Sequence, residues 1–365
     1  MSIFYKNILW IMVFATLSVF VQMYDEKTID GEKTRRIKTI WALVGIAPII
    51  YWVTTRGYIG DTYAYTKNFN ETPAVFSEIF TYMSTVTKDK GFYFFTALIK
   101  MFITKNVTVY FFILALFQGL ALMNLYKKYS SNYILSIFMF IASTDYISWM
   151  CNGIRQYTAV TITLFAFKYI LENRKVPAII IILFASLFHG TALLVIPFVF
   201  IAQGDAWNKR TILFILATLV AVMFVDQFTN ILDGMLQETQ YQNVVSDWNE
   251  WEDDGTNILR VLVYAVPTIL SLVGLKYVRF ENNKLINICV NMSVVSTGLY
   301  LVSMVTSGIF IGRLPIYFSI YNYILLPWEI DHIFEKSSAK LINILLVICY
   351  VGFYYTQVHL AWGYV

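Results

Sequence analysis

The sequence predicts an all-α polytopic membrane protein, and its composition and its apolar pattern both support this prediction. Of its 365 residues, 58% are hydrophobic and only 14% are charged, whereas soluble domains carry about 25% charged residues. Apolar segments long enough to cross a bilayer as a helix recur along the whole chain. We therefore expect one transmembrane domain over residues 1–365, built from about 10–12 membrane helices.

The apolar segments are about 17–25 residues long, which is the length that a membrane-spanning helix needs. The first has only Lys6 as an upstream charge and no small-residue cleavage site, so we interpret it as a span rather than a signal peptide. The predicted spans lie near residues 3–23, 39–54, 107–126, 132–150, 155–171, 211–228, 258–278, 285–306, 312–330 and 341–358.

Short loops rich in Lys and Arg mark the cytoplasmic side of a membrane protein. Residues 228–257 have the opposite character, because they include acidic residues and no Lys or Arg, and we place this acidic loop outside. The net charge of +4 is spread over small clusters, which gives no support for nucleic-acid binding. The predicted cytoplasmic clusters are Lys33, Arg35, Arg36 and Lys38; Lys127 and Lys128; Arg174 and Lys175; Lys209 and Arg210; Lys276, Arg279 and Lys284; and Lys336 and Lys340.

The apolar run of residues 177–201 lies between two of these basic clusters, so one straight span cannot join them if both are cytoplasmic. His189-Gly190 offers a break in its middle, because Gly is a poor residue for a helix interior. We expect two half-helices that meet near His189 and line a cavity, as broken helices at membrane depth do. A single crossing, kinked at Gly190 and Pro197, is the alternative.

A second long outer loop, residues 55–92, interleaves aromatic and charged residues. Within it, Phe76, Ile79, Phe80 and Met83 recur at helical spacing. This spacing predicts an amphipathic helix that lies on the membrane surface and roofs a cavity.

Polar residues interrupt the apolar surroundings at several points, and Arg155 is the most informative. An arginine at mid-bilayer costs about 2.5–3.5 kcal/mol on insertion scales, so its side chain is expected to face a polar cavity or an anion. Arg56 and Arg313 stand in similar surroundings. The planar guanidinium group grips phosphate oxygens in a bidentate way, so the three arginines predict an anion site. In the alternative interpretation, Arg155 and Arg313 are interface residues, and Asp61 only caps a helix.

The three cysteines, Cys151, Cys289 and Cys349, are far apart and lack metal-ligand spacing. We interpret all three as packed apolar residues, since free Cys is often buried. We expect no metal and no cofactor.

Taken together, these motifs resemble the EpsG family, within the wider group of Wzy-type polysaccharide polymerases. The resemblance covers about residues 1–330 and is strongest over residues 51–201. The motifs that carry it are Arg56 with Gly60-Asp61-Thr62 and Tyr65; Lys90-Gly91-Phe92; Asn152 with Arg155-Gln156; Leu187-Phe188-His189-Gly190-Thr191-Ala192-Leu193; and Arg313.

The resemblance implies a GT-C-like enzyme of the bacterial inner (plasma) membrane, with a site that faces the periplasm or the outside. Such an enzyme transfers a growing glycan from undecaprenyl diphosphate to the non-reducing end of a new lipid-linked repeat unit, in O-antigen, capsule or exopolysaccharide biosynthesis. It uses no nucleotide sugar and no metal. The family setting also implies contact with membrane lipid and a separate chain-length co-polymerase.

In such a reaction, Arg155, with Arg313 and Arg56 as partners, would stabilise the leaving diphosphate. Asp61 or His189 would take the proton of the attacking hydroxyl, and the sequence does not choose between them. Inverting transfer is expected, because no Asp or Glu nucleophile stands out in the membrane core. We interpret Lys88-Asp89-Lys90 as a solvated turn. Further candidates for substrate binding are Tyr65, Asn152, Gln156, Lys90 and Tyr317.

Two other functional classes remain open at this point. An oligosaccharide ligase uses the same lipid diphosphate donor and differs only in its acceptor. A flippase or transporter also needs a cationic cavity and broken helices, although the two halves of the chain show no repeated motifs.

Overall fold

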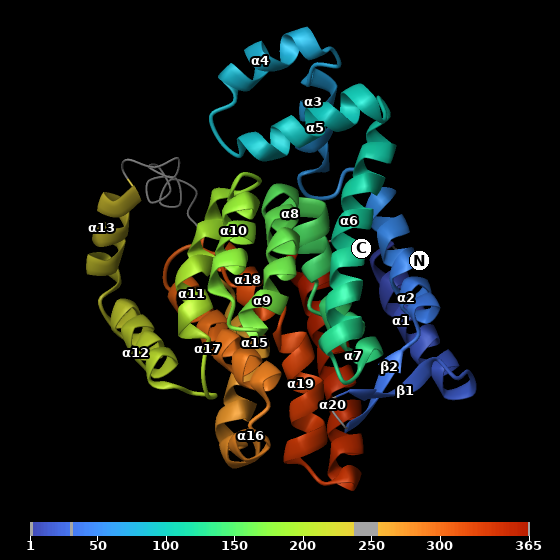
Figure 1. Cartoon of the computed structure of the whole chain (residues 1–365), viewed down its shortest axis with the longest axis vertical. Helices are drawn as coiled ribbons and strands as arrows, with labels where there is room; N and C mark the ends of the chain where they lie inside the picture. Colours follow the sequence, from blue (N-terminus) through green and yellow to red (C-terminus); the bar gives the residue numbers. More distant parts are fainter. Residues whose placement is uncertain (1–2, 30–31, 237–254, 364–365) are drawn as a thin grey trace. The chain divides into compact units, whose positions relative to one another are not determined.

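The computed structural model describes residues 3–29, 32–236 and 255–363, and these residues are almost entirely helical (Figure 1). The prediction of an all-α polytopic membrane protein is confirmed. Within the described residues, three helices are long and apolar enough to cross a membrane, or up to six if each bent helix pair forms one span. Four further apolar helices are shorter, at 10–17 residues.

The chain begins with α1 (Ile3–Phe20), and a β-hairpin of β1 (Tyr24–Ile29) and β2 (Glu32–Ile37) then leads to α2 (Thr39–Thr54). The strands are antiparallel, with Tyr24 opposite Ile37. The sequence predicted only a basic loop here. A hairpin forms because both strands contain Thr and Ile, which are good strand formers.

The segment between α2 and α6 (Val107–Tyr129), which the sequence predicts to lie outside, contains α3 (Thr62–Glu71), α4 (Phe76–Thr85) and α5 (Lys90–Phe102). The predicted helix with Phe76, Ile79 and Phe80 on it is α4. Ile79 is buried, whereas Phe76 and Phe80 are exposed. Apolar rings in contact with solvent suit a membrane surface, which stays a prediction.

The long helix α6 (Val107–Tyr129) confirms the predicted span of residues 107–126. Its N-terminus is capped by Asn106, which accepts hydrogen bonds from the amides of Thr108 and Val109. The next predicted span is bent by 71°, between α7 (Tyr133–Ala142) and a π-helix, η1 (Tyr146–Asn152). Thr144 at this bend has a left-handed φ of 68°. The chain continues through α8 (Ile154–Thr163), η2 (Leu164–Ala166) and α9 (Phe167–Leu171).

The predicted break near His189 is present. Helix α10 (Lys175–Ser186) ends before it, and a 3-10 turn, η3 (Gly190–Leu194), leads into α11 (Val195–Ile201). Whether the two halves return to one membrane side stays a prediction.

The C-terminal half repeats the pattern of bent spans. Helices α12 and α13 meet at 105°, and α15 and α16 meet at 71°. Helix α13 occupies the start of the predicted acidic loop of residues 228–257, most of which, residues 237–254, lies outside the described residues. The elements are α12 (Lys209–Met223), α13 (Val225–Leu236), α15 (Ile258–Val273), α16 (Leu275–Glu281), α17 (Lys284–Met304), η4 (Ile311–Arg313), α18 (Ile316–Ser319), α19 (Asn322–Ile333), α20 (Lys336–Tyr355) and η5 (Thr356–Ala361).

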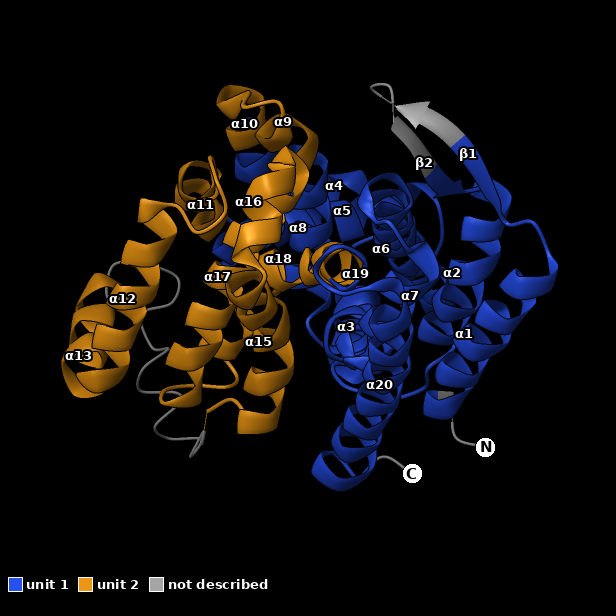
Figure 2. Cartoon of the chain, turned by 90° about the horizontal axis from the view of Figure 1, so that it is seen from below, with its two compact units in different colours: residues 1–166, 180–192, 330–365 blue, residues 167–179, 193–329 orange. Residues whose placement is uncertain are grey.

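The chain divides into two compact units that are interleaved in sequence (Figure 2). Unit 1 comprises residues 1–166, 180–192 and 330–365, and unit 2 comprises residues 167–179 and 193–329. In unit 2, α17 packs against α12 and α15. The chain passes repeatedly between the units. The expectation of a single transmembrane domain stays a prediction.

In unit 1, the helices of the predicted outer loop lie apart from two of the basic clusters. Helices α3, α4 and α5 lie at one end, whereas the hairpin and the starting end of α20 lie at the other (Figure 1). This separation agrees with the predicted orientation, in which the basic clusters are cytoplasmic and residues 55–92 are outside.

The cysteines follow the prediction only in part. Cys151 and Cys289 are buried, as expected, but Cys349 is exposed. The physical reason is its position on α20, where Leu341, Ile344 and Ile348 are also exposed. An apolar helix face of this kind suits lipid contact.

Glu329 on α19 is a buried carboxyl group in unit 2. It has no exposed surface, and neither of its carboxyl oxygens has a hydrogen-bond partner among the described residues. An unsatisfied buried polar group costs about 1–3 kcal/mol. Glu329 therefore weakens the fold locally.

We predict that Glu329→Met raises the midpoint of thermal unfolding in detergent, because Met fills a similar volume without an unsatisfied oxygen. Glu335→Met is the matched control, since Glu335 is exposed, and it should leave the midpoint nearly unchanged. A lower midpoint for Glu329→Met than for the wild type would contradict the prediction.

Candidate functional site

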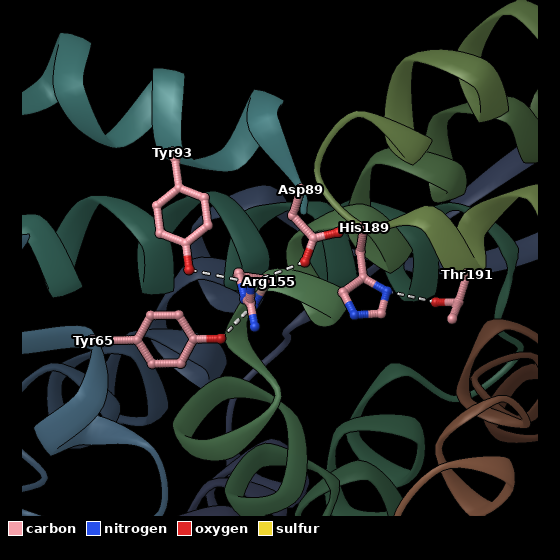
Figure 3. Close-up of polar contacts among 6 residues, drawn as sticks. All are labelled: Tyr65, Asp89, Tyr93, Arg155, His189 and Thr191. Atoms are coloured by element: carbon pink, nitrogen blue, oxygen red, sulfur yellow. Dashed lines mark hydrogen bonds and ion pairs between the residues drawn. The ribbon is translucent and has the colours of Figure 1, made fainter. Parts of the chain in front are cut away.

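The candidate site lies in unit 1, where three segments far apart in sequence meet. These are the outer helices α3 and α5, the first turn of α8, and the helix break at residues 187–190 (Figure 3). Each segment contributes at least one polar side chain. The site is therefore built from helix ends and breaks rather than from the middle of a span.

Arg155 is the centre of this site. Its Nη1 lies 3.0 Å from Oδ2 of Asp89 and donates a hydrogen bond of 3.2 Å to the Tyr93 hydroxyl. The guanidinium carbon lies 5.6 Å from the centre of the Tyr93 ring. The Arg155 side chain is 31% exposed, whereas that of Asp89 is only 5% exposed. The cation is thus accessible while its counter-ion is enclosed.

The backbone explains why Arg155 is held so firmly. Gly153 ends the π-helix, so Arg155 falls in the first turn of α8, where amide groups have no partner within the helix. The hydroxyl of Tyr65 accepts a hydrogen bond of 3.2 Å from the backbone amide of Arg155. Tyr65 is itself buried against Phe92 at the start of α5, with the ring centres 5.9 Å apart.

Asp89 corrects the interpretation of Lys88-Asp89-Lys90 as a solvated turn. Lys88 and Lys90 are exposed, but the side chain of Asp89 is buried, and Asp89 has a left-handed φ of 53° at the N-cap of α5. Its second oxygen, Oδ1, has no hydrogen-bond partner among the described residues. Burial raises the pKa of Asp89 above its ordinary value, and Arg155, the backbone N–H of Gly190 and Lys88 oppose this shift.

Gly91 brings Asp89 to the helix break. Its amide donates to the carbonyl of Leu187 at 2.8 Å. A Cβ atom at position 91 would lie 2.7 Å from that same carbonyl oxygen, which is too close for any side chain. The contact requires glycine, and it explains the Lys90-Gly91-Phe92 motif.

His189 lies at the break, on the side of Asp89 away from Tyr93 (Figure 3). Its Nδ1 is 2.7 Å from the Thr191 hydroxyl, and the ring is half-buried. This contact fixes the orientation of the imidazole. The structure thus brings His189, Arg155 and Tyr65 together as the sequence predicted.

Arg56 is enclosed rather than open to a ligand. It is 5% exposed, and its guanidinium lies 4.3 Å from the Phe111 ring centre. Its Nε donates to the Thr62 hydroxyl at 2.8 Å and its Nη1 to the Val53 carbonyl at 2.6 Å, while Nη2 is buried with no hydrogen-bond partner in the described part of the chain. Burial lowers the pKa of Arg56. In this arrangement Arg56 braces the loop that carries Asp61.

Asp61 occupies the N-cap position of α3, but its side chain makes no capping hydrogen bond. The capping interpretation is therefore not supported. Asp61 is half-buried, and its charge adds to the effect of burial, which is the main cause that raises the pKa of Tyr65, so Asp61 lies near the Arg155 contact. Gly60, with a φ of 57°, lets this loop approach Asn152, because a Cβ at position 60 would lie 3.0 Å from the Cys151 carbonyl oxygen.

The remaining predicted residues are spread more widely. Asn152 is half-buried and Gln156 is buried next to Arg155, whereas Lys90 is exposed. Arg313, which is half-buried at the end of η4, and Tyr317, which is buried in α18, belong to unit 2.

Sequence reasoning missed Asp89 and Tyr93. The available signal was the acidic residue directly before Lys90-Gly91-Phe92, a motif already singled out. Its charged neighbours concealed it, because they suggest a solvated turn. No group of three or more His, Cys, Asp or Glu that could hold a metal occurs in the described part of the chain.

Chemically, this arrangement suits an anion that approaches Arg155 from its open side. The guanidinium is held by the Asp89 carboxylate and the Tyr93 hydroxyl, and the Tyr65 hydroxyl holds the backbone amide of the same residue, so the cation is in place before charge develops beside it. The half-buried imidazole and the carboxyl groups provide proton acceptors close by.

Comparison with known proteins adds one finding. The family model described as the EpsG family matches residues 38–363. No curated protein and no solved structure matches the chain.

We predict that Gly91→Ala destabilises the protein by about 1–3 kcal/mol, because its methyl group would overlap the Leu187 backbone. Thermal unfolding in detergent measures this. Gly352→Ala is the matched control: a Cβ at this position in α20 meets no atom within 4 Å, so alanine should be neutral or stabilise the helix by up to about 1 kcal/mol. Equal midpoints for Gly91→Ala and the wild type would show that the close approach is not needed.

Proposed function

The chain belongs to the EpsG family, as its motifs predicted, and on this premise we propose that it is a glycosyltransferase that polymerises lipid-linked repeat units of a polysaccharide. Family membership supports a role in polysaccharide biosynthesis in a bacterial membrane. The finer proposal is that the donor is a growing glycan on undecaprenyl diphosphate. The acceptor is the non-reducing end of a new lipid-linked unit.

The observation that carries this proposal is the partly exposed guanidinium of Arg155, fixed by Asp89 and Tyr93. A lipid diphosphate gains negative charge as its bond to the sugar breaks. A fixed guanidinium in a partly dehydrated site stabilises that charge, and its planar fork matches two phosphate oxygens.

In the proposed reaction, a hydroxyl of the acceptor sugar attacks the anomeric carbon of the donor glycan. The bond from this carbon to the diphosphate oxygen breaks, and the bonding electrons stay with the diphosphate. Direct attack on the face opposite the leaving group inverts the configuration and requires no enzyme nucleophile. No step calls for a metal ion or a nucleotide sugar.

The proton of the attacking hydroxyl goes to Asp61 or His189. The position of His189 beside the Arg155 cluster favours it, because its ring is held by Thr191 and borders the same space (Figure 3). Tyr65 holds the Arg155 backbone, and Asn152, Gln156 and Lys90 are proposed to bind the substrate. For Arg313 and Tyr317, which belong to unit 2, the predicted role in substrate binding stays a prediction.

The proposed location is the bacterial inner membrane, with the Arg155 cluster on the outer side. Its proposed partners are the undecaprenyl diphosphate-linked oligosaccharide, membrane lipid and a chain-length co-polymerase. The end-to-end separation of the basic and outer elements in unit 1 supports this orientation.

The test is to incubate the purified protein with a lipid diphosphate-linked repeat unit, without metal or nucleotide sugar, and to separate the products by size. A ladder spaced by one repeat unit supports the polymerase. Transfer only to a different acceptor points to a ligase, and translocation without transfer points to a flippase.

We predict that Arg155→Ala lowers the rate of ladder formation about 100-fold or more, the effect of losing one strong donor to a developing oxyanion. Arg155→Lys should lower it about 10-fold or more, since it keeps the charge and loses the fork. Arg174→Lys is the matched control, because Arg174 is exposed and pairs only locally, with Glu172. A ladder from Arg155→Lys at the wild-type rate would remove Arg155 from the diphosphate role.

A further inference from the structure

The cation proposed to bind diphosphate already has a partner. Nη1 of Arg155 lies 3.0 Å from Oδ2 of Asp89, so an incoming diphosphate competes with a carboxylate for the same guanidinium. A phosphate group and Asp89 would also repel each other at such short range. The resting ion pair has to change when the donor binds.

Asp89 has little freedom to move away. It stands at the N-cap of α5 with a left-handed backbone, two residues before Gly91, which is tied to the Leu187 carbonyl. Its side chain is 5% exposed, and Oδ1 is buried without a hydrogen-bond partner among the described residues. If a diphosphate takes the place of Asp89 at Arg155, Asp89 is left as a buried carboxylate that has lost its closest counter-ion and keeps only the Gly190 N–H and Lys88 in its support. A group in that position favours its neutral form.

We propose, on the basis of the proposed function, that Asp89 is an exchangeable counter-ion that a lipid diphosphate displaces from Arg155, with uptake of one proton by Asp89. In this exchange, the diphosphate and one proton from solvent enter the site. The diphosphate replaces Asp89 as the partner of Arg155, and the Asp89 carboxylate becomes a carboxylic acid. When the product diphosphate leaves, Asp89 returns the proton and pairs with Arg155 again. Asp89 is a positioning residue in this scheme, since it acts through Arg155.

The exchange would speed product release in an enzyme that turns over many times. Each cycle leaves a lipid diphosphate on a strong cation, and tight product binding slows the next cycle. Oδ2 of Asp89 lies 3.0 Å from Nη1 of Arg155 in the free protein. The Asp89 carboxylate therefore competes with the product diphosphate for Arg155 and speeds its release.

The direction of the pH dependence follows from the groups around Asp89. Facing it are Arg155 on α8, Lys88 and Lys90 next to it in the chain, Tyr93 on α5, Tyr65 on α3 and His189 at the break. In the free protein, Arg155 lowers the pKa of Asp89, and in the complex this support is lost, so the pKa is higher. Between these two pKa values, lowering the pH favours binding; above both, Asp89 is charged in either state and the coupling vanishes.

The experiment measures binding of a short-chain polyprenyl diphosphate to the full-length protein in detergent, from pH 5 to 8. The wild-type affinity should rise as the pH falls, by up to about tenfold per pH unit more than in Asp89→Asn. The asparagine variant keeps the size and tolerates the left-handed backbone. It should bind about tenfold more tightly at pH 8, because the competitor is gone. Titration of the ligand itself is common to both proteins.

Tyr93→Phe is the matched control. It removes the other side-chain contact of Nη1 and leaves Asp89 in place, so its affinity changes but its pH slope should match that of the wild type. Equal slopes in the wild type and Asp89→Asn would overturn the proposal. So would weaker binding by a correctly folded Asp89→Asn protein, since this would make Asp89 a structural support of Arg155.

Kinetics separate release from chemistry. Asp89→Asn should retain single-turnover transfer and lose rate over many turnovers, with stronger inhibition by added polyprenyl diphosphate. Loss of single-turnover transfer would place Asp89 in the chemical step and overturn the proposal. The binding assay is independent of the ladder: a protein that shows the Asp89-dependent slope but forms no ladder retains the exchange, while polymerisation fails.

Discussion

The ion pair between Arg155 and Asp89 is the contact around which the candidate site is arranged. It joins the first turn of α8 to the start of α5, and Gly91 ties the same point to the helix break at Leu187. A buried charge pair is stable only when its geometry is good and its remaining polar atoms are satisfied. Here the Tyr93 hydroxyl accepts a further hydrogen bond from the guanidinium, whereas Oδ1 of Asp89 has no hydrogen-bond partner among the described residues. The burial of Asp89 therefore carries an unfavourable free energy, and Asp89 is the residue whose contacts a bound ligand would change most.

Much of this fold was predictable because its signals are local. Apolar length predicted helices such as α6, the glycine beside His189 predicted the break, and the spacing of Phe76 and Ile79 predicted α4. The bends were not predictable. Hydropathy reports that a segment prefers lipid, but the 71° bend after α7 depends on the left-handed Thr144, which no apolar pattern announces.

The site was predicted in part, for a related reason. Arg155, Tyr65 and His189 announce themselves as polar residues in apolar surroundings, and the structure brings them together. Asp89 gives no such signal in the sequence, because the burial of its side chain comes from contacts with segments about 65 and 100 residues further along the chain. Arg56 shows the opposite case: its apolar surroundings were read correctly, but they enclose it against Phe111 instead of opening it to a ligand.

The contrast between the two arginines shows what a helix break contributes. Arg56 follows the end of α2 and is satisfied by its own loop, through Val53 and Thr62. Arg155 follows a π-helix, where the backbone is interrupted and the first amides of α8 have no partner within the helix, so that Tyr65 can accept a hydrogen bond from the Arg155 amide. The start of α8 and the guanidinium both contribute positive potential at the same place. A span without a break would pair all its amides internally, so the interruption at residues 152–154 is what makes Arg155 a suitable anion site.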